Sequence, residues 1–375
     1  MRWHAPQETA LLPLPLTYEE CRARFRRAVR AAGFGFEAYP IAAPGPHGEA
    51  LSTDVVHLGA ERPERALLLL SGVHGVEGFI GSALQCDLLQ RLDAAMLPEE
   101  VAIVLVHPVN PWGMAFSRRQ NESNVDLNRN WRRSEISPIE NDAYDAVHAI
   151  VCPDTPELPS LDELFAHIRA LVAERGSAWV AAAITQGQYR HADGLHYGGA
   201  VTEEPCLNLE RIVERHLAGV DRLFTLDLHT GHGPHGAITL LCDQPPGSSQ
   251  YQFLSKLLGP EQVEATVENP DATTSLKSGQ IANGMGAFLG ARVAHATSAE
   301  FGTVGEGAQL AATCMENWVV HRGDRSDPEH EAQVWRYRGC FTPDERAWEQ
   351  QCLAAGRELV EASVAAVADW GDDDD

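Results

Sequence analysis

The sequence predicts an α/β fold with helices on both faces of a mixed, mostly parallel central sheet. Two continuous apolar runs, Arg65–Ser71 and Val101–His107, are typical of strands that are buried on both faces. A helical stretch from about Phe79 to Leu92 lies between them, and this order predicts a strand–helix–strand unit. The 375 residues allow a large buried core, and no repeat or low-complexity linker divides them. We therefore expect a single-domain α/β/α sandwich over residues 1–375.

Apolar runs and capping patterns predict the remaining elements. Further strands are expected at Val55–Leu58, Arg222–Leu228, Ala237–Cys242 and Arg292–Ser298. Further helices are expected at Tyr18–Ala32, Leu161–Arg175 and Glu204–Leu217. The segment from Thr342 to Glu345 (TPDE) matches a capping box with proline at the first helical position, which predicts a C-terminal helix over 343–369. An acidic tail is expected at 372–375.

The composition restricts the partners and the compartment. Lys and Arg total 29 against 53 Asp and Glu, which gives a formal net charge of −24. Because so acidic a chain repels a polyphosphate backbone, we expect no nucleic acid partner. No apolar stretch approaches the ~18 residues of a membrane span, so no membrane partner is expected. The eight cysteines include no CxxC motif, and we expect reduced thiols and a cytoplasmic location, while the oligomeric state stays open.

His74 and Glu77 form an HxxE pattern just after the first apolar run. Residues three positions apart in a tight turn project to one side, and an imidazole with a carboxylate suits a zinc site. Glycines at positions 72, 75 and 78 allow the backbone to turn sharply here. The pattern is also compatible with an ordinary structural pair, because the chain contains 16 histidines.

A polar loop follows the second apolar run. Residues 121–131 have the sequence NESNVDLNRNW, and Arg118 and Arg119 precede them. In open α/β sheets, ligands bind to loops beyond the carboxyl ends of the strands. Arginine suits bidentate recognition of a carboxylate, and asparagine can fix its geometry. The alternative is a solvated cluster of charges that holds the loop together.

Two further polar residues are expected at strand exits. His229 lies in LDLHTG, where a ligand can reach across the sheet edge, although a structural histidine is the alternative. Glu300 lies in SAEFGT and suits the role of general base for a metal-bound water, because a strand end fixes its carboxylate. Glu306 is the nearby alternative and lies in a glycine-rich turn.

The order of these motifs resembles the zinc carboxypeptidase (M14) superfamily, which also holds the aspartoacylase and succinylglutamate desuccinylase deacylases. The motifs are HxxE, DLNRN after two arginines, DLHTG and AEFGT, of which the first two are the most specific. The segments RRQNESNVDLNRNW, GQYRHADGLHYGG and EFGT resemble an uncharacterised bacterial branch, DUF2817. The resemblance extends from about Ala60 to Val320 and implies a zinc carboxypeptidase-like fold. Compared with a digestive-type carboxypeptidase, the interval between Glu77 and His229 is long, which implies a helical insertion around 135–220.

The resemblance implies a catalytic centre with one zinc ion per chain. His74, Glu77 and His229 match its three zinc ligands, which leave a fourth position open for water. Glu300 matches the general base, which would deprotonate that water and then protonate the leaving amine. Arg119 matches the arginine that polarises the scissile carbonyl.

The resemblance also implies a site for the substrate carboxylate. Asn128 and Arg129 match the pair that grips this carboxylate, and Asp126 would orient the loop. The tyrosine that closes over the substrate in secreted members has two candidates here, Tyr189 and Tyr197, and a buried aromatic is the alternative for each.

The sequence therefore predicts a zinc-dependent hydrolase that cleaves an amide bond in a small carboxylate-bearing substrate. The first hypothesis is a metallocarboxypeptidase that releases a C-terminal residue from a small peptide. The second is a deacylase of N-acyl amino acids, and both use the same metal and a substrate carboxylate. A third, of another class, is a binding protein that retains metal without turnover. Glu300 argues against the third, because retention of metal needs no such carboxylate.

Overall fold

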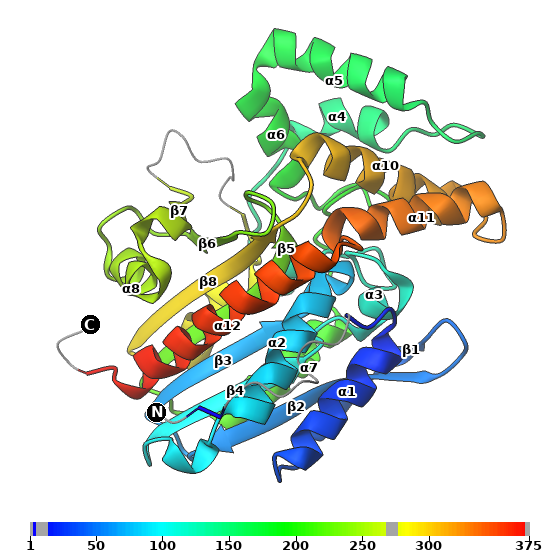
Figure 1. Cartoon of the computed structure of the whole chain (residues 1–375). Helices are drawn as coiled ribbons and strands as arrows, with labels where there is room; N and C mark the ends of the chain where they lie inside the picture. Colours follow the sequence, from blue (N-terminus) through cyan, green and yellow to red (C-terminus); the bar gives the residue numbers. More distant parts are fainter. Residues whose placement is uncertain (1–2, 5–13, 268–276, 372–375) are drawn as a thin grey trace.

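An eight-stranded sheet forms the centre of the computed structural model, which describes residues 3–4, 14–267 and 277–371 (Figure 1). The strands lie in the order β1-β2-β4-β3-β5-β8-β6-β7. Their bounds are β1 Glu37–Pro44, β2 Ala50–Gly59, β3 Arg65–Ser71, β4 Val101–His107, β5 Arg222–Gly231, β6 Ile238–Cys242, β7 Val263–Ala265 and β8 Val293–Gly302.

Parallel pairing dominates the middle of the sheet. β3 pairs with β4 on one side and with β5 on the other, and β8 follows β5, all in parallel. β2 runs antiparallel to β4, and β6 runs antiparallel to β8, so the sheet is mixed. β3, β4 and β5 are buried along almost their whole length, which explains their continuous apolar runs. The predicted α/β fold with a mixed, mostly parallel sheet is confirmed.

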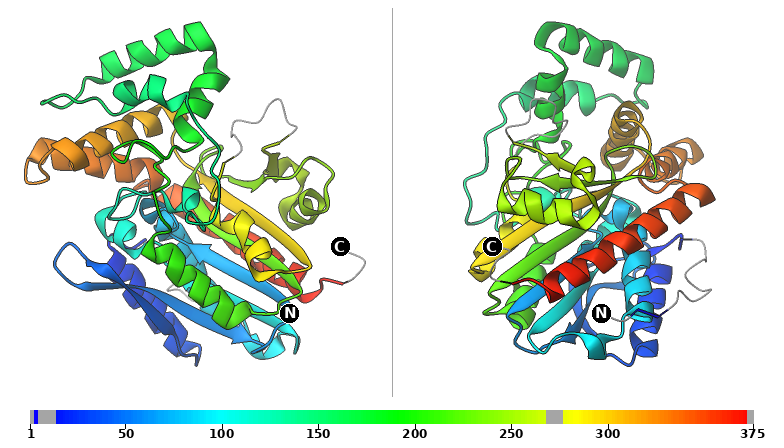
Figure 2. Two further views of the ribbon diagram at one scale, coloured as in Figure 1. Left: turned by 180° about the vertical axis from the view of Figure 1, so that it is seen from behind. Right: turned by 60° about the vertical axis from the view of Figure 1, so that its left-hand side comes forward.

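Helices cover both faces of this sheet. Figure 1 shows α1, α2 and α12 in front of it, and the view from behind in Figure 2 shows α7 and α9 on the other face. The helix bounds are α1 Tyr18–Ala31, α2 Gly78–Arg91, α3 Pro111–Phe116, α4 Tyr144–Val151, α5 Leu161–Arg175, α6 Ser177–Thr185, α7 Glu204–Leu217, α8 Ser249–Leu258, α9 Ile281–Leu289, α10 Glu306–Arg322, α11 Pro328–Phe341 and α12 Arg346–Ala368. Two short 3-10 helices, η2 Gly75–Glu77 and η4 Leu127–Arg129, lie in the polar turns.

The side chains of β3 contribute alternately to two hydrophobic cores. Leu67 and Leu69 belong to the core that includes residues of α1, α2 and α12. Leu68 and Leu70 belong to the core that includes residues of α7 and α9. Because successive side chains of a strand point to opposite faces, one continuous apolar run fills both cores. This is the three-layer arrangement that the sequence predicts.

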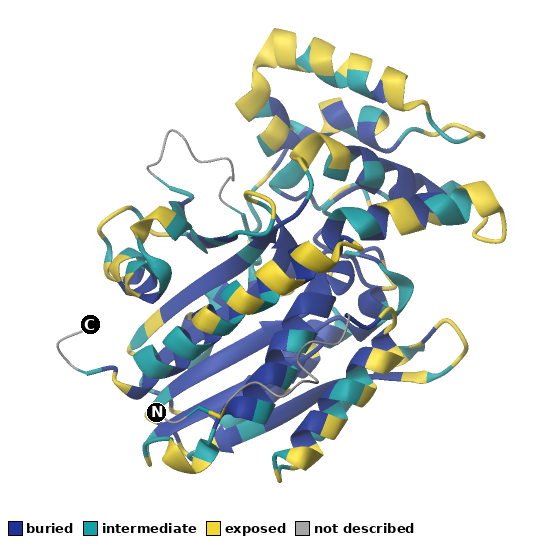
Figure 3. Ribbon diagram, viewed as in Figure 1, coloured by how far each residue is buried: buried dark blue, intermediate teal, exposed yellow. Residues whose placement is uncertain are grey.

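Three helices, α4, α5 and α6, form a layer of their own beside α10 at one end of the sheet (Figure 1). Their apolar residues pack with Cys314 and Met315 of α10, while the outer surface of α5 is exposed (Figure 3). These helices fall within the insertion expected around 135–220. α7 lies in the same range but packs on the sheet. The division of the chain into domains stays a prediction.

The C-terminal helix begins later than its predicted start at position 343. α12 begins at Arg346, and Thr342 instead ends α11. The Thr342 hydroxyl donates to the carbonyl oxygen of Val76 at 3.0 Å, a long-range bond that local sequence does not reveal. The expected acidic tail, 372–375, lies outside the described residues. No helix in the described ranges is long and apolar enough to cross a membrane.

Candidate active site

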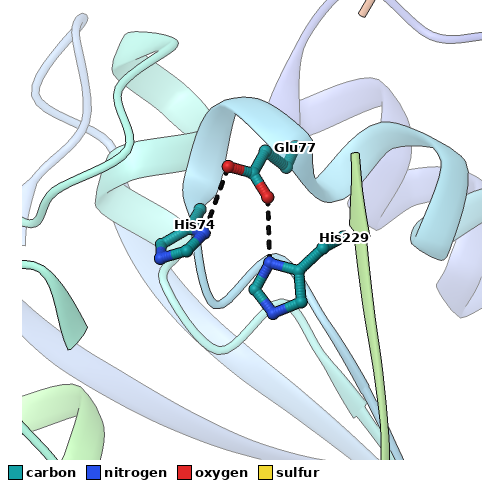
Figure 4. Close-up of side chains that lie close together, drawn as sticks. All are labelled: His74, Glu77 and His229. Atoms are coloured by element: carbon teal, nitrogen blue, oxygen red, sulfur yellow. Dashed lines mark hydrogen bonds and ion pairs between the residues drawn. The ribbon is translucent and has the colours of Figure 1, made fainter. Parts of the chain in front are cut away.

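Three polar side chains meet at the carboxyl ends of two parallel strands. His74 and Glu77 lie in the turn after β3, and His229 lies near the end of β5. One nitrogen of each histidine and one carboxylate oxygen of Glu77 all lie within 4.8 Å of one another (Figure 4). All three residues are buried. Glu77 and His229 are 152 positions apart but meet because β3 and β5 are neighbours in the sheet. The structure therefore brings the three predicted ligands together.

Glycines shape the turn that carries the first two ligands. A Cβ atom on Gly75 would lie 2.0 Å from the carbonyl carbon of Gly113 in α3, so this close approach requires glycine. Gly72 has a φ of 64°, a left-handed conformation that residues with a side chain rarely adopt. The Val76 amide donates to the Arg118 carbonyl at 2.9 Å, which ties the turn to the polar loop. These contacts fix the positions of both ligands.

The hydrogen bonds of the two imidazoles suit a cation between them. Nε2 of His74 lies 3.0 Å from Oδ1 of Asp126. Nε2 of His229 lies 2.7 Å from Oδ2 of Asp227. Each Nδ1 faces Glu77, at 3.1 Å from Oε1 for His74 and at 2.9 Å from Oε2 for His229. In a neutral imidazole, a carboxylate that accepts the Nε2 hydrogen leaves Nδ1 with a lone pair. Although Nδ1 of His74 is buried and lies 3.1 Å from Glu77, it makes no hydrogen bond with a described residue.

The carboxylates in and around the trio of His74, Glu77 and His229 attract positive charge, and a metal ion would supply this charge in place of a proton on His229. Burial opposes ionisation of Glu77, but the imidazoles of His74 and His229 outweigh it and lower the pKa of this carboxyl. Burial opposes protonation of His229, but Asp227 and Glu77 outweigh it and raise the pKa of His229 well above its usual value. Two nitrogens and one carboxylate form the donor set that catalytic zinc takes, with one position left open. The residues present can therefore hold a zinc ion.

Arg119 lies against the trio. Its Nε donates to Oδ2 of Asp126 at 2.9 Å, and its Nη1 donates to Oε1 of Glu77 at 3.1 Å. Burial favours the neutral form of Arg119, but the two carboxylates outweigh it and raise its pKa above the usual value. The guanidinium therefore stays charged. Its side chain is 15% exposed, so its other donors can reach a bound molecule.

Glu300 lies beside His229 on the neighbouring strand. The two residues are register partners in the parallel pair of β5 and β8, so their side chains leave the sheet on the same face. Oε2 of Glu300 accepts a hydrogen bond from the His232 amide at 3.3 Å, and the residue is half-buried. Glu306, the alternative base, is exposed at the first residue of α10. The structure therefore places Glu300, rather than Glu306, next to a predicted ligand.

Asn128 and Arg129 are buried in η4 and bonded to other parts of the protein. The three guanidinium nitrogens of Arg129 donate, at 2.8 to 3.1 Å, to the carbonyl oxygens of Asn128, Thr185 and Gln186. Oδ1 of Asn128 accepts a hydrogen bond from the Ile281 amide at 3.0 Å. Because a guanidinium carries five N–H donors, two of those on Arg129 are not used by these bonds. Recognition of a substrate carboxylate by this pair stays a prediction.

The two candidate tyrosines contact the same loop. The Tyr189 hydroxyl donates to the Arg129 carbonyl at 2.8 Å, and the Arg133 guanidinium lies 4.8 Å from the centre of its ring. Tyr197 is half-buried, and its carbonyl oxygen accepts from the Asp126 amide at 2.7 Å. Tyr189 therefore supports the polar loop, which agrees with the alternative of a structural aromatic residue rather than one that closes over a substrate.

Sequence reasoning assigned no role to two residues that orient the site. Asp227 lies two positions before His229 on β5, and this spacing on a strand, which places both on one face, was a usable signal. Nδ1 of His196 lies 3.3 Å from Oδ2 of Asp126, which is 70 positions away, so no local spacing reveals it. His196 has a left-handed φ of 52°, and burial lowers its pKa to about 4.

An α/β sandwich with a buried His–Glu–His trio, an arginine and a nearby glutamate defines a class of candidate metallohydrolases. Within this class, the family described as "Protein of unknown function (DUF2817)" matches residues 15–355, and the chain belongs to this family. The resemblance to this branch is therefore confirmed. No curated protein matches the chain.

The chain resembles several solved structures at low sequence identity. The murein-tripeptide amidase MpaA from Escherichia coli O157 is 16% identical, with a TM-score of 0.41 over 87% of this chain and 100% of that one. Bovine thrombin-activatable fibrinolysis inhibitor is 11% identical, with a TM-score of 0.45 over 95% and 99%. A succinylglutamate desuccinylase/aspartoacylase from Rhodobacter sphaeroides is 14% identical, with a TM-score of 0.36 over 77% and 66%. At such identities the function must be argued from the site itself.

Proposed function

We propose that this protein is a zinc-dependent hydrolase that cleaves an amide bond in a small carboxylate-bearing substrate. The observation that carries the proposal is the buried trio of His74, Glu77 and His229, with Arg119 and Glu300 beside it. The first candidate reaction is the release of a C-terminal residue from a small peptide, as in a metallocarboxypeptidase.

The residues around the trio supply the steps of such a reaction. A zinc ion bound there would polarise the scissile carbonyl and lower the pKa of water to about 7. Glu300 would accept a proton from this water and pass it to the leaving amine. The charged Arg119 would stabilise the negative charge that develops on the carbonyl oxygen. The unused donors of Arg129, with Asn128, would hold the substrate carboxylate and so position the scissile bond.

Deacylation of N-acyl amino acids is the alternative reaction, because it needs the same residues and a substrate carboxylate. A metal-retaining binding protein is the alternative from another class. Arg119 and Glu300 beside the trio argue against it, because retention of metal needs neither. The cytoplasmic location expected from the sequence stays a prediction.

A panel of dipeptides and N-acyl amino acids, assayed with zinc-loaded protein, tests the proposal. We expect turnover of compounds with a free carboxylate next to the scissile amide. Converting this carboxylate to an amide should lower kcat/KM roughly 10- to 150-fold, because a hydrogen bond between charged groups is worth about 1.5–3 kcal/mol. Equal kcat/KM for acid and amide would contradict carboxylate recognition. If the protein cleaves no compound of the panel, the proposed hydrolase activity is contradicted.

A further inference from the structure

Lys277 lies beside the candidate active site, in a segment that is fixed to the polar loop. The Trp131 amide donates to the Gly279 carbonyl at 3.0 Å, and the Ile281 amide donates to the Asn128 side chain at 3.0 Å. A Cβ atom on Gly279 would lie 2.4 Å from the Arg129 carbonyl oxygen, so the two backbones are in close contact. These contacts hold the segment that carries Lys277 against η4.

Lys277 lines a pocket next to Glu300. Leu241 of β6 and Ser298 of β8 are register partners on one side of this pocket. Ser298 lies two positions before Glu300 on the same strand, so both side chains are on the same face of the sheet. The pocket therefore adjoins the proposed base. Its lining consists of Leu241, Asp243, Thr266, Lys277, Gln280, Asn283 and Ser298.

No described residue forms a bond that neutralises the charge of Lys277. Among the described residues its ammonium has no hydrogen bond or ion pair, although Arg129, Glu300 and Arg119 are close enough to influence its ionisation. Burial and the Arg129 guanidinium lower the pKa of Lys277 to about 7, and Glu300 only partly offsets them. An anion bound in the pocket would supply a negative charge that no described residue supplies by a direct bond.

The other charged groups nearby are already bonded. Three nitrogens of Arg129 donate to carbonyl oxygens, and Arg119 is paired with Asp126 and Glu77. Asp243, the carboxylate in the pocket lining, accepts a hydrogen bond from Gln250 at 2.8 Å. Among the described residues, Lys277 therefore makes fewer hydrogen bonds and ion pairs than the neighbouring cations Arg119 and Arg129.

We propose that Lys277 determines specificity by binding an anionic side chain of the substrate, so that the residue released is a dicarboxylic amino acid. This inference rests on the proposed function, because the pocket adjoins Glu300. A carboxylate at the end of a short side chain matches a lysine in the lining of a polar pocket.

Matched acidic and neutral substrates test the proposal. The zinc-loaded protein is assayed with N-benzoylglycyl-L-glutamate against N-benzoylglycyl-L-glutamine, and with N-acetyl-L-glutamate against N-acetyl-L-glutamine, so that both candidate reactions are covered. We expect kcat/KM to favour the acidic member of the active pair by roughly 10- to 100-fold. Lys277→Met should remove this preference while the neutral substrate is still cleaved. Lys277→Arg should retain it, and so should the control Lys256→Met, which changes the exposed lysine of α8.

Binding of the free amino acids gives a readout that does not depend on turnover. Calorimetric titration with L-glutamate and L-glutamine should show tighter binding of glutamate to the wild type but not to Lys277→Met. If glutamate binds in this way but no substrate is cleaved, Lys277 still binds an anionic side chain, but the proposed function falls and with it the release of a dicarboxylic residue. If substrates are cleaved without acidic preference, the proposed function stands and the inference falls. If Lys277→Met lowers kcat/KM equally for acidic and neutral substrates, the inference is also overturned, because Lys277 then has a purely structural role.

Discussion

At the residue scale, the orientation of His229 depends on a carboxylate of its own strand. Asp227 lies 2.7 Å from Nε2, and no other residue contacts this nitrogen in the hydrogen bonds of the described chain. A carboxylate in this position fixes the tautomer of a ligating histidine and raises its basicity.

Asp227→Asn should therefore weaken zinc binding roughly 10- to 100-fold while the protein still folds. Competition with a chromophoric chelator measures the affinity. Asp87→Asn is the matched control, because Asp87 is also a buried carboxylate but pairs with Arg357 on the far side of the sheet. An unchanged zinc affinity in Asp227→Asn would refute a role for Asp227 in orienting the ligand.

Glu300 is predicted to act on protons and not to hold the metal. Glu300→Gln keeps the size of the side chain but cannot accept a proton, so turnover should fall roughly 10²- to 10⁴-fold. Zinc content, measured by elemental analysis, should not change. The exposed Glu306→Gln serves as the control and should keep normal activity. A near-normal rate in Glu300→Gln would remove this residue from the mechanism.

Sequence reasoning could single out the three candidate ligands, because they follow strand ends in a recognisable order. It could not show that the arginines near the loop are individually paired. Arg118 bonds to Glu316, which is 198 positions away, and Arg129 bonds to carbonyl oxygens of residues 185 and 186. Lys277 has no motif around it, and only the fold places it beside Glu300. Such partners come from distant segments, so local spacing does not encode them.

At the element scale, the HxxE turn contains η2, which packs closely on α3. Gly75→Ala would place a Cβ atom 2.0 Å from Gly113, so one of the two elements must move. Because Gly75 lies between His74 and Glu77, we expect loss of zinc binding together with lower thermal stability. Gly35→Ala is the control, since its Cβ would meet no atom within 4 Å. Normal zinc content in Gly75→Ala would show that the turn tolerates this displacement.

The elements that the sequence predicted best are those with strong local signals. The apolar runs of β3 and β4 and the capped helix α5 have the predicted bounds. β1 was not predicted, because as an edge strand it buries only one of its eight residues fully. The start of α12 was misplaced because Thr342 has the residue type of a cap, but its hydroxyl bonds to the turn at Val76. Tertiary contacts therefore override local capping where two distant segments meet.

At the scale of the whole molecule, the net charge of −24 does not determine the charge of the site. The arginines around the polar loop do not act as one positive patch, because Arg118 pairs with Glu316 and Arg132 pairs with Glu135. The charge of Arg119 is likewise balanced by the carboxylates of Glu77 and Asp126. Recognition of the proposed anionic substrate would therefore depend on a few donors in fixed positions and not on a broad electrostatic field.

The proposed zinc site can form only in the folded molecule, because Glu77 and His229 are 152 positions apart. Zinc should therefore stabilise the folded state, by about 2.7 kcal/mol when its concentration is 100 times Kd. For 375 residues, an unfolding entropy of about 2.1 cal/mol/K per residue makes this a rise of roughly 3 °C in Tm. Calorimetry of metal-free protein with and without added zinc measures the shift. His229→Ala should abolish it, whereas His47→Ala, which removes an exposed histidine, should not. An equal shift in His229→Ala would place the stabilising zinc elsewhere in the molecule.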